Sequence, residues 1–399
     1  MDNVPMYEKR DFKNIGDFLL MTGPACNMFC RHCGQMPIKS CHVCQPKLNP
    51  KVYQLMEHFI EYALGREMPN NYSRHIFFYG GEALLYWDFI KDIIASLTEK
   101  YDITHKTGFR FGIQSNGLLL TEDKVEFLNK YDVEFGFSYD APHPFAVRGY
   151  VSDEICDLVK KIDRHMVTST GNAINYDYLL AVRCLRAKFP NAFRHRIVPN
   201  LTRSFDMPED IYAYDWKKIG DAIRKLRIAA QLDDVFALKW FSTYVKILKG
   251  NHSIPANERV MSCMFRPTEF AFTPEGTFSL CHNSALFTGT VDDTWEVLKE
   301  KKKEFGEKNK SPECASCRHA DICKVLCPLN LQNEKGGRVV CEGFQRPLFD
   351  IMKSEIMKFS EPLALTDLKW YHKEEERMEQ EIQEFLLAGE KFKPRYQQC

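Results

Sequence analysis

The chain has 399 residues, which is enough for one large domain or two ordinary ones. Apolar residues make up 44% of it, as is typical of a globular protein. Lysine plus arginine and aspartate plus glutamate both total 54, so net charge provides no general attraction to nucleic acid, an anionic membrane or an acidic partner. No stretch combines basic with aromatic residues, so nucleic acid has little support as a substrate.

The N-terminus and the cysteine content bear on the cellular compartment. Residues 1–10 mix charges where a secretory signal needs an apolar core, and no later stretch is long and apolar enough to span a bilayer. We therefore expect a soluble, cytoplasmic protein with no membrane partner. In such a reducing compartment, fifteen cysteines indicate metal ligation or redox chemistry rather than disulfides.

Short apolar runs alternate with amphipathic helical patterns through the first half of the chain. The expected strands are Phe18–Met21, His75–Tyr79, Phe109–Gln114, Glu134–Tyr139, Ser169–Ile174 and Arg194–Pro199. The expected helices are Val52–Leu64, Phe89–Tyr101, Glu122–Tyr131, Glu154–His165 and Tyr178–Phe189. This order predicts an α/β fold with a parallel sheet joined by right-handed crossovers, and in α/β barrels the chemistry lies on loops after the strands.

The loop after the first expected strand carries three closely spaced thiols. Its sequence is Cys26-Asn27-Met28-Phe29-Cys30-Arg31-His32-Cys33. Three thiolates are able to hold three irons of a cubane cluster and leave the fourth iron open to a substrate or cofactor. A zinc site is the alternative, with a fourth ligand from His32, Cys41 or Cys44.

Three further motifs follow the next expected strands in order. They are Tyr79-Gly80-Gly81-Glu82-Ala83, then Gln114-Ser115-Asn116-Gly117, then Ser138-Tyr139-Asp140 with Arg148-Gly149. Together with the cysteine loop, this series resembles the radical S-adenosylmethionine (SAM) superfamily. The resemblance implies a partial (β/α)6 TIM-type barrel and assigns SAM binding to Gly80, Gly81, Glu82, Gln114, Asn116, Ser138, Asp140 and Arg148.

The resemblance also implies a reaction. A four-iron cluster, reduced by a flavodoxin- or ferredoxin-type partner, would cleave SAM to methionine and a 5′-deoxyadenosyl radical that abstracts hydrogen from the substrate. The chain departs from the family pattern at two positions. His32 stands where the family usually has an aromatic residue, and Ala83 replaces the usual proline after Gly-Gly-Glu.

A second cysteine-rich region lies toward the C-terminus. Its cysteines are Cys263, Cys281, Cys314, Cys317, Cys323, Cys327 and Cys341. These intervals resemble the SPASM extension of radical SAM enzymes, which implies two auxiliary four-iron clusters. By resemblance, Cys263, Cys281 and Cys327 bind the first cluster, while Cys314, Cys317, Cys323 and Cys341 bind the second. Some relatives add a cysteine where this chain has Glu269, so the fourth ligand of the first cluster stays open.

Alternatives accompany these assignments. A zinc ribbon is the other interpretation of Cys314, Cys317, Cys323 and Cys327. Residues 273–276 predict a turn between two short strands that brings Cys263 and Cys281 together, with Gly276 supplying positive φ. His282 is a candidate proton acceptor and otherwise a structural histidine. Cys41 and Cys44 bind metal, form a redox pair or are ordinary loop residues; Cys156 and Cys184 fit the core; Cys399 has no evident partner.

The expected organisation is a barrel over residues 15–225, a bridging helical segment over 226–262, a SPASM domain over 263–345 and a helical tail over 346–399, whose charge run we interpret as a solvated face.

Because SPASM enzymes mostly modify peptides, the leading hypothesis is oxidation, crosslinking, thioether formation or epimerisation of a peptide or protein side chain. Fewer than twenty residues precede the first expected strand, so leader recognition would need a separate partner, the barrel or the tail. The alternatives are a radical SAM enzyme for a small molecule such as an aminosugar or nucleoside, and a non-catalytic zinc-stabilised binding module.

Overall fold

The structure is a computed structural model, and it describes most of the barrel region together with parts of the C-terminal region. The described residues are 17–33, 42–65, 74–103, 108–199, 213–248, 269–279, 287–294, 296–298, 300–301, 304, 316–319 and 346–387. Among the cysteines of the second region, only Cys317 lies within these ranges, and His282 lies outside them.

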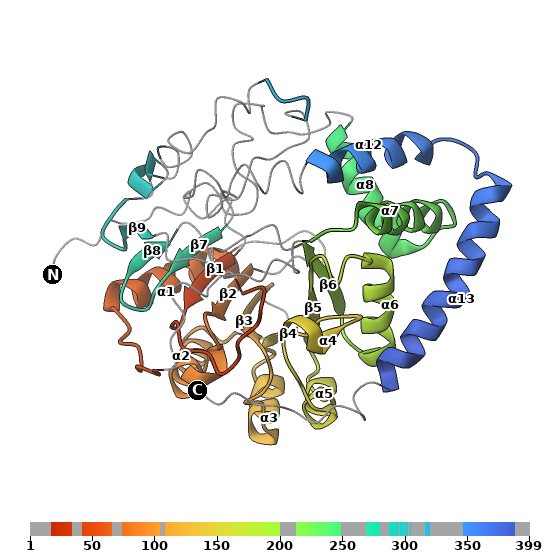
Figure 1. Cartoon of the computed structure of the whole chain (residues 1–399). Coiled ribbons are helices and arrows are strands. Elements are labelled where there is room, and N and C mark those ends of the chain that lie inside the picture. The colour runs from red at the N-terminus through yellow and green to blue at the C-terminus, as the bar shows by residue number, and fades with distance from the viewer. Residues whose placement is uncertain are drawn as a thin grey trace.

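The described strands form one nine-stranded sheet in the order β6-β5-β4-β3-β2-β1-β7-β8-β9. Neighbouring strands from β6 through β7 are parallel, whereas β8 pairs antiparallel with β7 and with β9. The strands are β1 Asp17–Met21, β2 Arg74–Tyr79, β3 Phe109–Ser115, β4 Glu134–Ser138, β5 His165–Gly171, β6 Arg194–Pro199, β7 Glu269–Phe272, β8 Thr277–Ser279 and β9 Phe287–Thr290. This sheet is the curved α/β core of a partial TIM-type barrel, as the sequence predicts (Figure 1).

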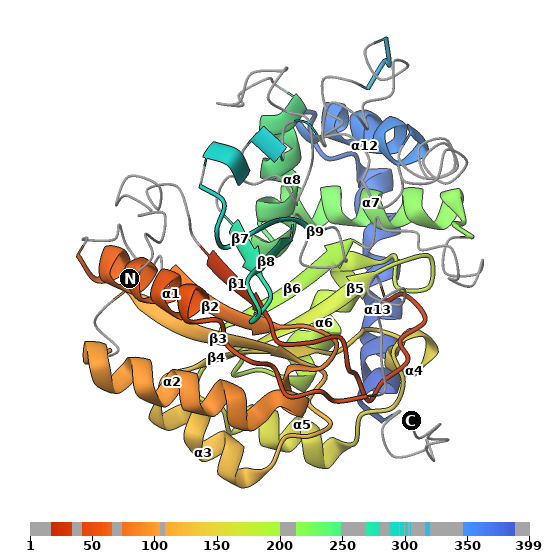
Figure 2. The same cartoon turned by 90° about the vertical axis from the view of Figure 1, so that its left-hand side faces the viewer.

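Helices cover the outer side of the curved sheet, and Figure 2 shows α1, α2 and α3 lying side by side there. The helices of the barrel are α1 Pro50–Leu64, η2 Ala83–Tyr86, α2 Trp87–Tyr101, α3 Glu122–Lys130, α4 Pro144–Val147, α5 Asp153–Lys160 and α6 Tyr178–Lys188. Alternate strand residues such as Phe18, Ile76 and Phe111 are buried in this layer. Phe59 of α1 packs on both Phe18 and Phe109. Because helices and strands both place apolar residues in this layer, each has a hydrophobic periodicity that can be recognised in the sequence.

Five of the six predicted barrel strands match the structure to within one residue at each end, and the fifth strand does not. β5 begins at His165, four residues before the predicted start, and α5 ends at Lys160, before the predicted end at His165. Buried Ile162 continues the apolar spacing of α5, so periodicity extends the predicted helix too far. His165 instead pairs with Phe135 of β4, so this residue belongs to the strand and not to the helix.

The turn predicted between two short strands is confirmed. It joins β7 to β8, and the backbone N–H of Gly276 donates to the Thr273 carbonyl at 3.0 Å. Gly276 has φ +100°, which a side chain would oppose. β7 also pairs with β1, so the sheet continues from the barrel into the region predicted to be a separate domain.

Four further helices follow the barrel, namely α7 Trp216–Gln231, α8 Val235–Leu248, α12 Arg346–Phe359 and α13 Leu365–Leu387. α7 begins ten residues before the predicted bridging segment. α12 packs on α7 and α8, while α13 runs along α6 and α7 (Figure 1). The charged tail is therefore not only a solvated face, because Arg227 of α7 pairs with both Glu355 and Asp367. Within the described ranges, no helix combines the length and the apolar character needed to cross a membrane.

Candidate functional site

The cysteine loop leaves β1 at its carboxyl end and is held by backbone contacts to two other segments. Cys26 and Cys30 are buried, and Cys33 is partly buried. The loop backbone donates from Thr22 to the Tyr79 carbonyl and from Arg31 to the Val147 carbonyl, both at 2.8 Å. These hydrogen bonds tie the cysteine loop to β2 and α4.

Gly80 and Gly81 allow the end of β2 to approach the cysteine loop closely. The Gly81 N–H donates to the Gly23 carbonyl at 2.9 Å, and the Glu82 N–H donates to the Ala25 carbonyl at 2.7 Å. A methyl group at Gly81 would lie 2.2 Å from the Ala25 oxygen. The glycine pair thus allows close contact between two backbone segments. The assignment of Gly80 and Gly81 to SAM stays a prediction.

Glu82 joins the end of β2 to the end of β3. One carboxylate oxygen accepts from the Leu84 N–H at 2.9 Å and the Ser115 hydroxyl at 2.7 Å, and the other accepts from the Asn116 N–H at 2.8 Å. The Asn116 side chain then donates to Asn27 of the cysteine loop at 2.9 Å. Glu82 and Asn116 thus brace the loop through three successive hydrogen-bonded segments.

Gln114 and Ser138 lie side by side at the ends of β3 and β4. The Gln114 amide donates to the Ser138 hydroxyl at 2.7 Å. A side chain at Gly136 would meet the Gln114 amide oxygen at 2.5 Å, so the glycine makes room for it. The two residues assigned by resemblance to SAM are therefore neighbours.

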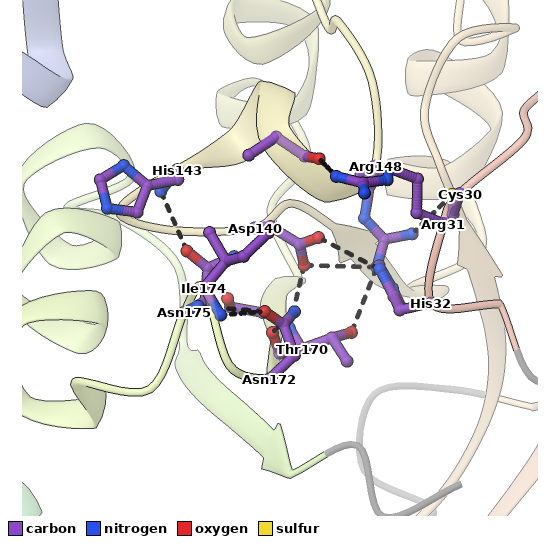
Figure 3. A network of polar contacts seen from close by, with 12 residues as sticks. Cys30, Arg31, His32, Asp140, His143, Arg148, Thr170, Asn172, Ile174 and Asn175 are labelled. Carbon is purple, nitrogen blue, oxygen red and sulfur yellow. Dashed lines mark hydrogen bonds and ion pairs between the residues drawn. The ribbon is translucent and has the colours of Figure 1, made fainter. Parts of the chain in front are cut away.

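Arg148 is the centre of a polar network beside the cysteines (Figure 3). One terminal nitrogen lies 3.7 Å from the Cys30 sulfur. The other lies 3.2 Å from His32 Nε2, 3.3 Å from the Thr170 hydroxyl and 3.4 Å from Asp140 Oδ1. Asp140 is fully buried and also accepts from the Thr170 N–H at 2.9 Å. The guanidinium is thus held against a cysteine by residues from the loop, β5 and the segment after β4.

Burial controls the ionisation of this network. It raises the pKa of the Cys30 thiol to about 12, although the positive charge of Arg148 acts in the opposite direction. Burial also lowers the pKa of His32 to about 4, against the opposing effect of Asp140. The nearby acids raise the pKa of Arg148 against the effect of its burial, so the guanidinium stays charged.

Residues 20–180, which contain this site, match the model of the radical SAM superfamily. They form a radical SAM superfamily domain. The radical SAM cyclopropyl synthase TigE of Paramaledivibacter caminithermalis is 24% identical over 344 residues, which cover 80% of this chain and 69% of TigE.

Solved structures share the fold of this chain. Native anSMEcpe with bound AdoMet and Cp18Cys peptide has a TM-score of 0.58 at 17% identity, covering 86% of this chain and 98% of that one. SuiB of Streptococcus suis bound to the precursor peptide SuiA has a TM-score of 0.51 at 13% identity, covering 81% and 74%. The predicted barrel class is confirmed by this agreement.

The radical SAM domain implies a four-iron cluster and SAM, and Cys26, Cys30 and Cys33 are the described side chains that would hold the cluster. Within the described ranges, no three His, Cys, Asp or Glu side chains are grouped closely enough for one metal ion. A four-iron cluster asks for another arrangement, because each thiolate binds a different iron.

Two buried polar atoms also suit a polar cofactor. Arg148 Nε and Asp140 Oδ2 are shielded from solvent and make no hydrogen bond with any described residue. A buried donor without an acceptor costs about 1–3 kcal/mol, so a carboxylate at Arg148 would relieve that cost.

The structure brings the predicted motifs together, since residues of all four strand ends meet around the cysteine loop. The auxiliary-cluster cysteines other than Cys317 and the histidine at 282 are outside the described residues, and Cys44 is exposed. Cys156 and Cys184 are fully buried, as predicted. Sequence reasoning missed two residues. Thr170 accepts a hydrogen bond from Arg148, and the Tyr86 hydroxyl accepts one from the Ala25 N–H at 3.1 Å. Neither carries a local sequence signal, because each acts through contacts between distant segments.

Proposed function

We propose that this radical SAM enzyme modifies a side chain of a peptide or protein. The product would be an oxidised residue, a crosslink, a thioether or an epimerised centre. The observation that supports this substrate class is a fold similarity that extends beyond the radical SAM domain to structures with bound peptides. One of them holds the Cp18Cys peptide with AdoMet, and the other holds the precursor peptide SuiA.

In this proposal, Cys26, Cys30 and Cys33 hold three irons, and the motif residues after β2, β3 and β4 hold SAM. When bound and reduced, the cluster and SAM supply a 5′-deoxyadenosyl radical. Arg148 would bind the carboxylate of SAM, for which its planar donor pair is suited. Glu82 and Asn116 would keep the loop rigid, and the buried surroundings of Cys30 would exclude water from the reacting centre.

The C-terminal region would carry the auxiliary clusters in a SPASM domain over residues 263–345. Cys263, Cys281 and Cys327 would bind one cluster, while Cys314, Cys317, Cys323 and Cys341 would bind the other. Within this range, the described strand β7 pairs directly with β1 of the barrel. A flavodoxin- or ferredoxin-type protein would supply electrons.

The test combines metal content with product formation. Anaerobically reconstituted protein should contain about twelve irons with matching sulfide and form 5′-deoxyadenosine when reduced. Cys30→Ala should abolish this formation and keep the auxiliary iron, whereas Cys317→Ala should lower the iron content through another cluster. SAM cleavage that persists in Cys30→Ala would refute the ligand assignment.

The substrate is tested separately, with peptides encoded beside the gene and with a panel of aminosugars and nucleosides. We expect a mass change only in a peptide, and only with active SAM cleavage. Turnover confined to the small molecules would overturn the peptide proposal while leaving the radical chemistry intact.

A further inference from the structure

His32 occupies the position at which this chain departs from the usual aromatic residue of the family pattern. Its side chain is 7% exposed and belongs to the cysteine loop, one residue before Cys33. In Figure 3 the ring points into the network of Arg148 and Asp140. The substitution therefore adds a polar contact between the cysteine loop and the barrel.

The geometry fixes what His32 does in that contact. A guanidinium has no acceptor, so the 3.2 Å contact requires Arg148 to donate and His32 Nε2 to accept. The ring proton is then on Nδ1, which faces Asp140 Oδ2 at 3.8 Å, beyond hydrogen-bond distance. A phenylalanine has no acceptor and would leave this Arg148 donor without the loop contact.

The same guanidinium nitrogen also contacts Asp140 and Thr170, but both contacts are longer than the one to His32. Asp140 and Thr170 belong to the barrel, whereas His32 belongs to the loop that carries Cys30. His32 is thus the acceptor that ties the orientation of Arg148 to the loop, and with it the 3.7 Å approach to the Cys30 sulfur.

We propose that His32 is a positioning residue that orients Arg148 toward the SAM site by accepting its hydrogen bond. The proposal rests on the assignment of Arg148 to SAM made above. It predicts that His32 affects SAM binding through Arg148 and not through cluster ligation.

The experiment is a double-mutant cycle on SAM affinity with reconstituted holoenzyme. His32→Phe should weaken SAM binding about tenfold, the effect of losing a hydrogen bond to a charged group, while iron content stays unchanged. His32→Gln should restore most of the affinity, because its amide oxygen reaches about as far as Nε2. His32→Asn is the matched polar variant whose oxygen is too short, and it should bind SAM as weakly as His32→Phe.

The second arm places His32→Phe in an Arg148→Ala background. If His32 acts through Arg148, the substitution adds almost nothing to the loss already caused by Arg148→Ala. The change that SAM causes in the spectrum of the reduced cluster should be nearly normal in His32→Gln and weakened in His32→Phe and His32→Asn. His143→Phe is the control, because this side chain points away from Arg148 in Figure 3, and it should bind SAM normally.

Additive losses would mean that His32 acts independently of Arg148 and would overturn the proposal. Normal SAM binding by both His32→Phe and His32→Asn, with a loss in Arg148→Ala, would overturn it too and leave the role of Arg148 standing. Normal binding by Arg148→Ala would overturn both. None of these outcomes depends on the peptide substrate, which is tested by product analysis.

Discussion

At the residue scale, His75 carries a positive charge that could not be predicted from the sequence. It lies near the start of β2, with Nδ1 at 2.9 Å from Asp17 of β1 and Nε2 at 3.4 Å from Glu134 of β4. Burial alone would lower the pKa of His75, but the hydrogen bond to Asp17 and the ion pair with Glu134 outweigh it and raise the pKa to about 9. The histidine is therefore protonated at neutral pH and ties together three strand starts.

This charge predicts a pH dependence of stability. Because the folded pKa of His75 lies above the ordinary value of about 6.5, its stabilisation is complete below pH 6.5 and is lost as the pH rises through 9. The loss is on the order of 3 kcal/mol. Urea unfolding of the native protein and of His75→Gln should give a difference that is large at pH 6 and shrinks by pH 9.5. A difference independent of pH would contradict the raised pKa.

At the element scale, the end of β2 and the cysteine loop depend on the absence of a side chain at Gly81. A methyl group there would meet the Ala25 and Pro24 carbonyl oxygens at 2.2 and 2.5 Å, and backbone cannot yield as a flexible side chain does. Gly81→Ala should displace the loop, so we expect it to lose about four irons and SAM-dependent cleavage.

The matched control is Gly220→Ala in α7, where, apart from the backbone of the helix itself and the neighbouring residues, no atom lies within 4 Å of the added methyl group. Alanine in a helix is favoured over glycine, so this variant should gain about 0.5–1 kcal/mol and keep its iron. Iron retained in Gly81→Ala as fully as in Gly220→Ala would show that the close approach is not needed for cluster binding.

The same elements show how far sequence reasoning reaches. Barrel strands such as β2 and β3 were predicted because their buried alternate residues belong to one apolar layer. The predicted start of β5 is four residues too late, because Ile162 continues the helical pattern of α5. The strand start becomes evident only from the pairing with β4. Of the site, the cysteines and Glu82 follow from spacing, whereas the contacts of Thr170 and Tyr86 depend on segments brought together by the fold.

At the scale of the whole molecule, charged side chains join the C-terminal helices to the barrel. Arg227, which is 3% exposed, pairs with Glu355 of α12 at 2.7 Å and Asp367 of α13 at 2.5 Å. The fully buried Lys225 pairs with Asp177, the residue that caps α6, and with Glu374 of α13. The charge run of the tail is thus partly an interface, which local composition alone does not distinguish from a solvated face.

This interface yields a test of how firmly the tail is held. Arg227→Met keeps the length of the side chain but removes the shared partner of Glu355 and Asp367, which retain Lys358 and Arg224. Losing hydrogen bonds between charged groups should cost about 1.5–3 kcal/mol. We expect a lower urea midpoint and faster amide exchange in α13 than in the native protein. Lys218→Met is the control, because Lys218 and Asp215 form an exposed pair at 3.9 Å, and it should change stability by less than about 0.5 kcal/mol. If both variants behaved alike, the ion pairs of Arg227 would not be needed to hold the tail.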